Sequence, residues 1–322
     1  MWYLNAEKLN VINQQLSDKV SQKFAQPIKA RYFETSQLAL YDVAQGLVQF
    51  LSHKPKVSVI RKGTSLFEGI LGQFYRMQTP LIFKSESDSI ETFVNQLDHE
   101  VNCTLWSSEN EITGEIFLNQ KQRQNYHQLL SSRRIFSIEI KSYINSEDLQ
   151  ILKENPYAVI IATGSIFNSD DCLVLHTDKL KTPFLVAQFQ KNLSLVFDEL
   201  DRKMTKFFFD QDHFFAQNAE LGYLKNQTSD VLSLKDRVVY SFDKINAAYL
   251  VEQLSLSDNQ AFAPSLLPVW LIESFQSWWA EAQSEKFIRG LLVLKLSPDT
   301  QKLLIDIKNE NDKLTKVSSW II

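Results

Sequence analysis

The chain has 322 residues, of which 44% are hydrophobic and 22% charged, and its formal net charge is −4. This length allows one large or two medium domains, and the composition excludes a disordered chain, a coiled coil and a disulfide scaffold. The small negative charge gives no reason to expect a nucleic-acid partner. No apolar stretch approaches the roughly twenty residues of a membrane span, and the N-terminus lacks the pattern of a secretion signal. With two cysteines, we expect a cytoplasmic protein without a membrane partner.

Strands and helices alternate over the first half of the chain. Apolar and β-branched runs predict strands at Val57–Ile60, Leu81–Phe83, Asn102–Trp106, Ile135–Ile140, Ala158–Ala162 and Cys172–Leu175. Helical spacing predicts helices at 6–24, 36–52, 65–76, 87–97 and 146–154. This alternation predicts β-α-β units and a mainly parallel sheet with helices on both faces, which is an α/β fold.

The order of elements changes in the second half. Long Phe-rich helices are predicted over 184–222, and are followed by a strand at 237–242, helices at 246–254 and 266–283, a strand at 290–296 and a helix at 299–309. We therefore predict a large α/β domain over 1–205 and a small α+β domain over 206–322. The N-terminal helix is a candidate to pack on the small domain.

Most motifs that carry chemistry are missing. The chain has 8 glycines, whereas ordinary usage of about 7% would give roughly 23, and neither phosphate-binding glycine loop occurs. The histidines are isolated and the cysteines far apart, so no metal site is expected. Residues 163–165 (Thr-Gly-Ser) follow a strand where α/β proteins bind ligands, and are either a ligand contact or a plain turn. Glu109, Glu111 and Glu115 are expected to be surface charges.

Several segments, in order along the chain, are similar to the motifs of one enzyme family. The start MWYLNAEKL is similar to "YLDNAATT", and RYFETSQLAL, which ends at Leu40, is similar to "FTSGATEA" at the start of a helix. The segment VNCTLWSSENEITGEIF is similar to "VNNETG.I". Further similar segments are Ile135–Ile140 with Asp148 and Leu149, Tyr157–Leu175, Arg237–Leu254 and Leu291–Asp306. In these segments the chain resembles the class V aminotransferase and cysteine desulfurase family, which are fold-type I pyridoxal-phosphate (PLP) enzymes, and the resemblance implies a seven-stranded, mainly parallel sheet with one antiparallel strand.

The chain departs from this family at the residues that would hold the cofactor. The resemblance implies a lysine that forms a Schiff base with PLP, but no lysine occurs from Asn155 to Asp178. The aspartate that would pair with the pyridine nitrogen is replaced by Glu139. The desulfurase cysteine corresponds to Phe262, and the substrate-carboxylate arginine would lie near Val293. The remaining vestigial pocket candidates are Thr35, Ser36, Ser65, Ser165 and Asn168.

These losses agree with one another and predict an inactive homologue, that is, a pseudoenzyme. We expect it to have no catalytic residues and to bind no cofactor. The resemblance implies that the family cofactor would be PLP. Such a protein would be retained for protein–protein interaction or ligand sensing, as a homodimer or as a heteromer with an active relative. The alternative is a working enzyme that holds PLP without a covalent bond or uses the old cleft for another ligand. A third possibility is an unrelated α/β protein.

Overall fold

The computed structural model describes part of the chain. The described residues are 14–22, 28–33, 38–39, 42–44, 46–47, 56–60, 81–84, 97, 99–109, 114, 116, 118–164, 172–177, 180, 207–208, 236–241, 246–257, 260–263, 290–299, 302–303, 305–307 and 309–310. They fall into two compact units. The first comprises Met1–Glu109, Phe117–Ser165 and Ser169–Phe209, and the second comprises Asn110–Ile116, Ile166–Asn168 and Asp210–Ile322. The predicted boundary between residues 205 and 206 stays a prediction.

The first unit is built on a seven-stranded sheet. Its strand order is β1-β7-β6-β5-β4-β2-β3. The strands are β1 (Lys29–Phe33), β2 (Val57–Ile60), β3 (Leu81–Lys84), β4 (Cys103–Ser107), β5 (Phe136–Lys141), β6 (Ala158–Ala162) and β7 (Cys172–His176). Only β7 runs antiparallel to its neighbours β1 and β6, and the other four pairings are parallel. The predicted α/β fold with one antiparallel strand is confirmed.

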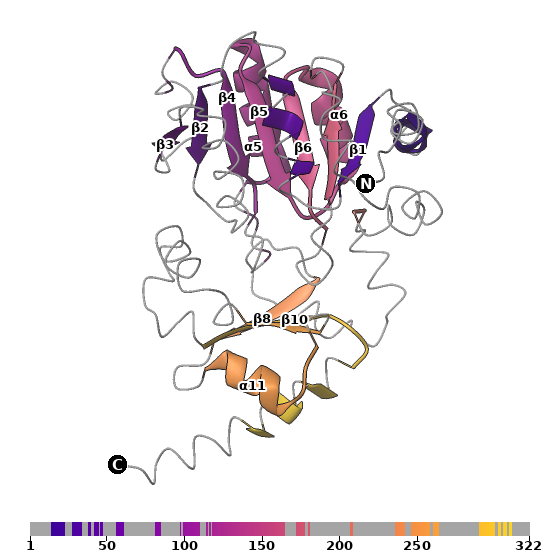
Figure 1. Ribbon diagram of the computed structural model, residues 1–322, viewed down its shortest axis with the longest axis vertical. Coiled ribbons are helices and arrows are strands. Elements are labelled where there is room, and N and C mark those ends of the chain that lie inside the picture. The colour runs from indigo at the N-terminus through magenta and orange to yellow at the C-terminus, as the bar shows by residue number, and fades with distance from the viewer. Residues whose placement is uncertain are drawn as a thin grey trace, which may run out of the picture. The chain divides into compact units, whose positions relative to one another are not determined.

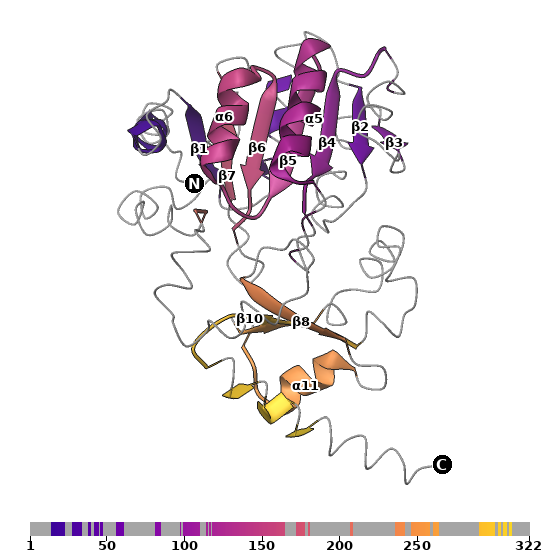
Figure 2. The same ribbon diagram turned by 180° about the vertical axis from the view of Figure 1, so that it is seen from behind.

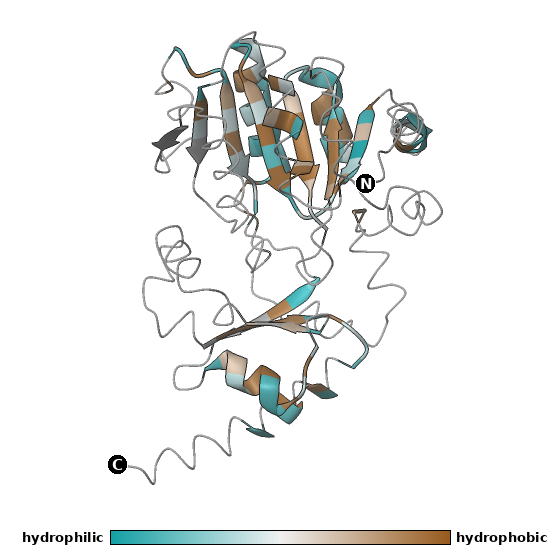
Figure 3. Ribbon diagram, viewed as in Figure 1, coloured by the Kyte–Doolittle hydropathy of each residue, from teal (hydrophilic) through white to brown (hydrophobic). Residues whose placement is uncertain are grey.

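Helices cover both faces of this sheet (Figures 1 and 2). Helices α5 (Gln120–Ser132) and α6 (Ser146–Glu154) lie on one face, and helical residues between 38 and 47 lie on the other. Strands β6 and β7 are apolar along most of their length (Figure 3), and every residue of β4, β5, β6 and β7 is buried. A parallel strand between two helical layers has no solvent face, so β6 is a continuous apolar run, whereas β5 alternates apolar residues with Ser137, Glu139 and Lys141.

The main core cluster joins α6 to strands β1, β6 and β7 and to the described N-terminal helical residues. Ser17 in that helix accepts a hydrogen bond of 2.9 Å from the Ala30 backbone N–H of β1, which ties it to the sheet edge. The cluster members are Leu16, Val20, Ile28, Ala30, Tyr32, Ile144, Leu149, Ile151, Leu152, Ala158, Ile160, Ala162, Leu173, Leu175 and Phe207. The N-terminal helix therefore contributes to the core of the first unit.

Helix α5 begins with a reciprocal cap. The Asn119 side chain accepts from the Gln122 backbone N–H at 3.0 Å, while the Gln122 side chain accepts from the Asn119 backbone N–H at 2.9 Å. This capping box satisfies two donors that the first helical turn leaves without partners inside the helix. Because α5 carries buried polar side chains that contact β5, the position of its first turn matters for the site described below.

Asn119→Ala is expected to lower the free energy of unfolding by about 1 kcal/mol, because the first turn loses its cap. Urea unfolding monitored by circular dichroism measures this change. Asn125→Ala, at an exposed position inside the same helix, is the matched control and should not destabilise, since alanine has the higher helix propensity. Equal losses in the two variants would contradict a capping role for Asn119.

The described part of the second unit contains a three-stranded antiparallel sheet in the order β8-β10-β9. Its strands are β8 (Arg237–Ser241), β9 (Ala261–Phe262) and β10 (Leu291–Lys295). Helix α11 (Ala247–Gln253) packs on it through Ala247, Leu250 and Val251. In the described residues, none of the helices combines the length and apolarity needed to cross a membrane.

Two elements of the first unit differ from the sequence-based expectation. Residues 29–33 form strand β1 where the resemblance placed the approach to a helix, and α5 was not predicted. The helices predicted at 65–76, 266–283 and most of 87–97 and 184–222 lie outside the described residues.

Candidate functional site

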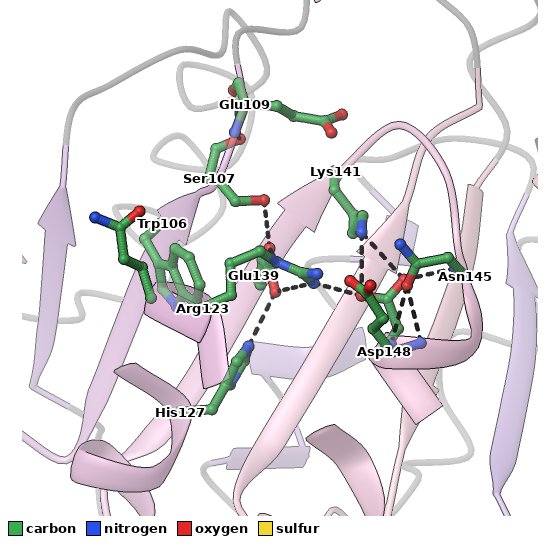
Figure 4. A network of polar contacts seen from close by, with 12 residues as sticks. Trp106, Ser107, Glu109, Arg123, His127, Glu139, Lys141, Asn145 and Asp148 are labelled. Carbon is green, nitrogen blue, oxygen red and sulfur yellow. Dashed lines mark hydrogen bonds and ion pairs between the residues drawn. The ribbon is translucent and has the colours of Figure 1, made fainter. Parts of the chain in front are cut away.

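Glu139 lies inside the sheet, in the middle of β5. It pairs in register with Trp106 of β4 and Ile160 of β6, and its side chain is completely buried. Side chains alternate along a strand, so Ser137 and Lys141 share its face. That face meets helices α5 and α6, and Figure 4 shows Glu139 at the centre of the polar side chains between them. A buried carboxylate needs hydrogen-bond donors and a cation to remain ionised.

Four donors occupy the Glu139 carboxylate. The Arg123 guanidinium donates from Nε to Oε1 at 2.7 Å and from Nη2 to Oε2 at 2.8 Å. Ser108 donates its hydroxyl to Oε1 at 2.5 Å, and His127 Nε2 lies 2.9 Å from Oε2. An ionised carboxylate offers about four acceptor positions, so these contacts use all of them.

Asp148 continues the network on the other side of Arg123. Its carboxylate accepts from Arg123 Nη2 and from Lys141 Nζ, the latter at 3.0 and 3.1 Å from its two oxygens. Asp148 also completes the capping box of α6, where its side chain accepts from the Asn145 backbone N–H at 2.7 Å. The network thereby joins α5, β5 and the first turn of α6 (Figure 4).

Two cations balance two carboxylates in this buried set. Burial alone would raise the pKa of Glu139, but the charge of Arg123 and hydrogen bonds from His127 and Arg123 hold it well below its usual value. Burial would lower the pKa of Arg123, yet the two carboxylates raise it well above its usual value. Burial outweighs the Glu139 hydrogen bond at His127 and lowers the pKa of that imidazole. His127 is therefore neutral at pH 7 and donates from Nε2–H.

An aromatic contact fixes the helix that supplies these donors. Trp106 of β4 packs edge-on against Tyr126 with ring centroids 4.5 Å apart, and lies 5.1 Å from the His127 ring. Its indole N–H donates to the Ser137 hydroxyl at 2.9 Å. Such aromatic pairs contribute about 0.5–1.5 kcal/mol beyond the area they bury. This packing places Arg123 and His127, one turn apart on α5, over β5.

A third carboxylate, that of Glu109, links the ends of β4 and β5. The Glu109 carboxylate accepts a hydrogen bond from the Ser142 backbone N–H. Glu109 is buried, with only 3% of its surface exposed. The expectation that Glu109 is a surface charge is therefore wrong. The Gly164 N–H donates to the Ser142 carbonyl at 2.8 Å, and Gly164 has φ 71°, a conformation that suits glycine. The Thr163 N–H donates to the Lys141 carbonyl at 2.9 Å, so residues 163–164 continue the pairing of β6 with β5 beyond the end of β6.

A separate buried cluster lies at the β1 edge of the sheet. Arg31 pairs with Asp42 and donates from Nε to His176 Nε2 at 3.1 Å. His176 Nδ1 lies 2.6 Å from the Thr177 carbonyl oxygen, so Nδ1 carries the proton and Nε2 accepts. Burial, reinforced by the charge of Arg31, lowers the pKa of His176 to about 3. Burial lowers the pKa of Arg31 to about 9, which leaves it charged at pH 7.

Among the predicted pocket residues, only Glu139 belongs to the described part of the chain. Thr35, Ser36, Ser65, Ser165 and Asn168 lie outside it, as do Glu111 and Glu115. Arg123 and His127 were missed because α5 was not predicted. Two signals could have found them: the Asn119–Gln122 capping pattern, and the spacing of 123, 126, 127 and 130, all of which are buried.

The residues present do not fit the cofactor that the resemblance implies. A protonated pyridine nitrogen would donate a hydrogen bond to the carboxylate of Glu139. That carboxylate has no exposed surface and already accepts from Arg123, His127 and Ser108. Both oxygens of Glu139 already accept two hydrogen bonds each from described residues, so a fifth donor would have to displace one of these.

The comparisons with known proteins identify the fold of the chain. No protein-family model matches the chain, and no curated protein matches it. Among solved structures, it is similar to the histidinol-phosphate aminotransferase from Clostridium acetobutylicum, at 10% identity, TM-score 0.56, and coverage of 97% of this chain and 91% of that one. It is also similar to a NifS-like protein, at 10% identity, TM-score 0.57, and coverage of 97% and 89%. A third is YbdL from Escherichia coli, described as having a methionine aminotransferase function, at 9% identity, TM-score 0.50, and coverage of 91% and 80%. The chain therefore has the fold of the fold-type I PLP-dependent aminotransferases.

Proposed function

We propose that this chain is a homologue of class V aminotransferases and cysteine desulfurases that has lost PLP chemistry and is retained for protein–protein interaction or ligand sensing. The observation that carries this proposal is the pairing of the Glu139 carboxylate with Arg123. The buried guanidinium makes two parallel hydrogen bonds to this carboxylate, and a cofactor ring would have to compete with them. The absence of lysine from Asn155 to Asp178 agrees, since a Schiff base needs an amine there.

A titration of the purified protein with PLP tests the proposal. We expect no imine absorption band and no rise in melting temperature, because a ligand raises stability only when it binds the folded state. Pyridoxamine phosphate is the companion ligand, since it cannot form an imine with surface lysines and so reports non-covalent binding alone.

A saturable rise in melting temperature with both ligands would contradict the proposal and support a working enzyme with a non-covalent cofactor. An absorption band with PLP that leaves the melting temperature unchanged would identify imines on surface lysines, and the proposal would stand.

We also propose that the protein is cytoplasmic and acts as a homodimer or as a heteromer with an active relative. The resemblance to the family supports the proposed assembly, because such enzymes build each active site from two subunits. Light scattering of the purified chain measures its mass. A single species near the monomer mass of 37.3 kDa would contradict the homodimer, and reconstitution with an active relative would then test the heteromer.

A further inference from the structure

Arg123 is held between two buried carboxylates like a bound ligand. Its guanidinium makes a fork with Glu139 and a further hydrogen bond to Asp148, and both carboxylates have no exposed surface. These partners come from elements other than its own helix, namely strand β5 and helix α6. A planar guanidinium matches carboxylate geometry in a way that a lysine ammonium does not.

The charge balance of the pocket depends on this one side chain. Lys141 contacts Asp148 through both of its oxygens, and His127 is neutral because burial lowers its pKa. Without Arg123, Glu139 would keep only neutral donors, and a buried carboxylate without a cation is costly. Among the described residues, Arg123 is thus the one cation that contacts Glu139.

We propose that Glu139 and Asp148 form a cation-binding pocket whose ligand is built into the chain: the Arg123 guanidinium replaces the protonated ring nitrogen of an external cofactor. This inference rests on the proposed function and names the residue that makes the fold complete without PLP. The pocket's ligand class is a planar cation with parallel N–H donors, such as guanidinium.

Chemical rescue of Arg123→Ala tests the proposal. We expect the variant to melt roughly 10 °C below the wild type, since one partner of a buried ion pair has been removed. Millimolar guanidinium chloride should restore several degrees to Arg123→Ala and none to the wild type. Sodium chloride controls for ionic strength and urea for a neutral molecule of the same shape. Lys121→Ala, exposed on the same helix, is the matched control and should melt like the wild type.

Arg123→Ala/Glu139→Gln keeps the cavity but removes the charge that binds the cation, so it should lose the response to guanidinium. Equal effects of guanidinium and sodium chloride on Arg123→Ala, or no effect of either, would overturn the proposal. If Arg123→Ala does not fold alone, its refolding yield from urea with and without guanidinium takes the place of the melting temperature, and an unchanged yield would overturn it.

The two proposals can fail separately. Binding of PLP by the wild type tests the proposed function, whereas rescue of Arg123→Ala by guanidinium tests the role of Arg123. A wild type that binds PLP together with a rescued variant would place the cofactor elsewhere in the chain and leave the assignment of Arg123 intact.

Discussion

Replacing Glu139 by alanine is expected to lower the free energy of unfolding of the first unit by about 3–5 kcal/mol. The substitution leaves Arg123 and Lys141 to share the Asp148 carboxylate in a region without solvent access. It also removes the acceptor for the Ser108 hydroxyl and for His127 Nε2. One excess buried positive charge and two unsatisfied donors account for a loss larger than that of most single substitutions.

Urea unfolding at neutral pH measures this loss. Glu147→Ala, at a half-buried position in the first turn of α6, is the matched control and should cost under about 1 kcal/mol. The double variant Arg123→Met/Glu139→Leu should recover much of the stability, because apolar side chains of similar volume often replace a buried ion pair at little cost. A loss for Glu139→Ala no larger than that for Glu147→Ala would show that the network contributes little.

Acidification is expected to destabilise the first unit by on the order of 3 kcal/mol between pH 6.5 and about pH 4 through His176 alone. The folded-state pKa of His176 is about 3, whereas the ordinary value is 6.5. In this window His176 is protonated in the unfolded chain but not in the folded chain, so the free energy of unfolding falls as the pH drops. His127 has a lowered pKa as well, so it contributes with the same sign. Glu139 adds to the loss only below its ordinary value of 4.5, because its folded-state pKa is depressed.

The urea midpoint measured across this pH range checks the expected slope. His176→Gln removes the titrating group, so its stability should depend less steeply on pH by about one proton over the window. Gln128→Ala, at an exposed position where no ionisable group is removed, is the matched control and should keep the wild-type slope. If His176→Gln also keeps that slope, the buried imidazole does not govern the acid response.

Several elements could be predicted from local sequence because their signals are local. Strands β2 and β6 and helix α6 have the predicted bounds. Each is a short apolar or β-branched run, or an amphipathic run with a cap, and a proline lies two residues from one end of each. Strand β1 and helix α5 were not predicted. The five residues of β1 are a short run with two basic side chains, and this strand is defined by antiparallel pairing with β7, far along the chain.

By itself, the sequence determined the α/β class, the order of most strands and helices, and Glu139 as a residue of interest. Only the tertiary structure decided what Glu139 contacts. Arg123 lies 16 residues and Ser108 31 residues away from it in sequence, and they meet because α5 packs across β4 and β5. A charge is buried by packing between elements, and the partner that neutralises it is selected by distance in space, which local periodicity and propensity do not encode.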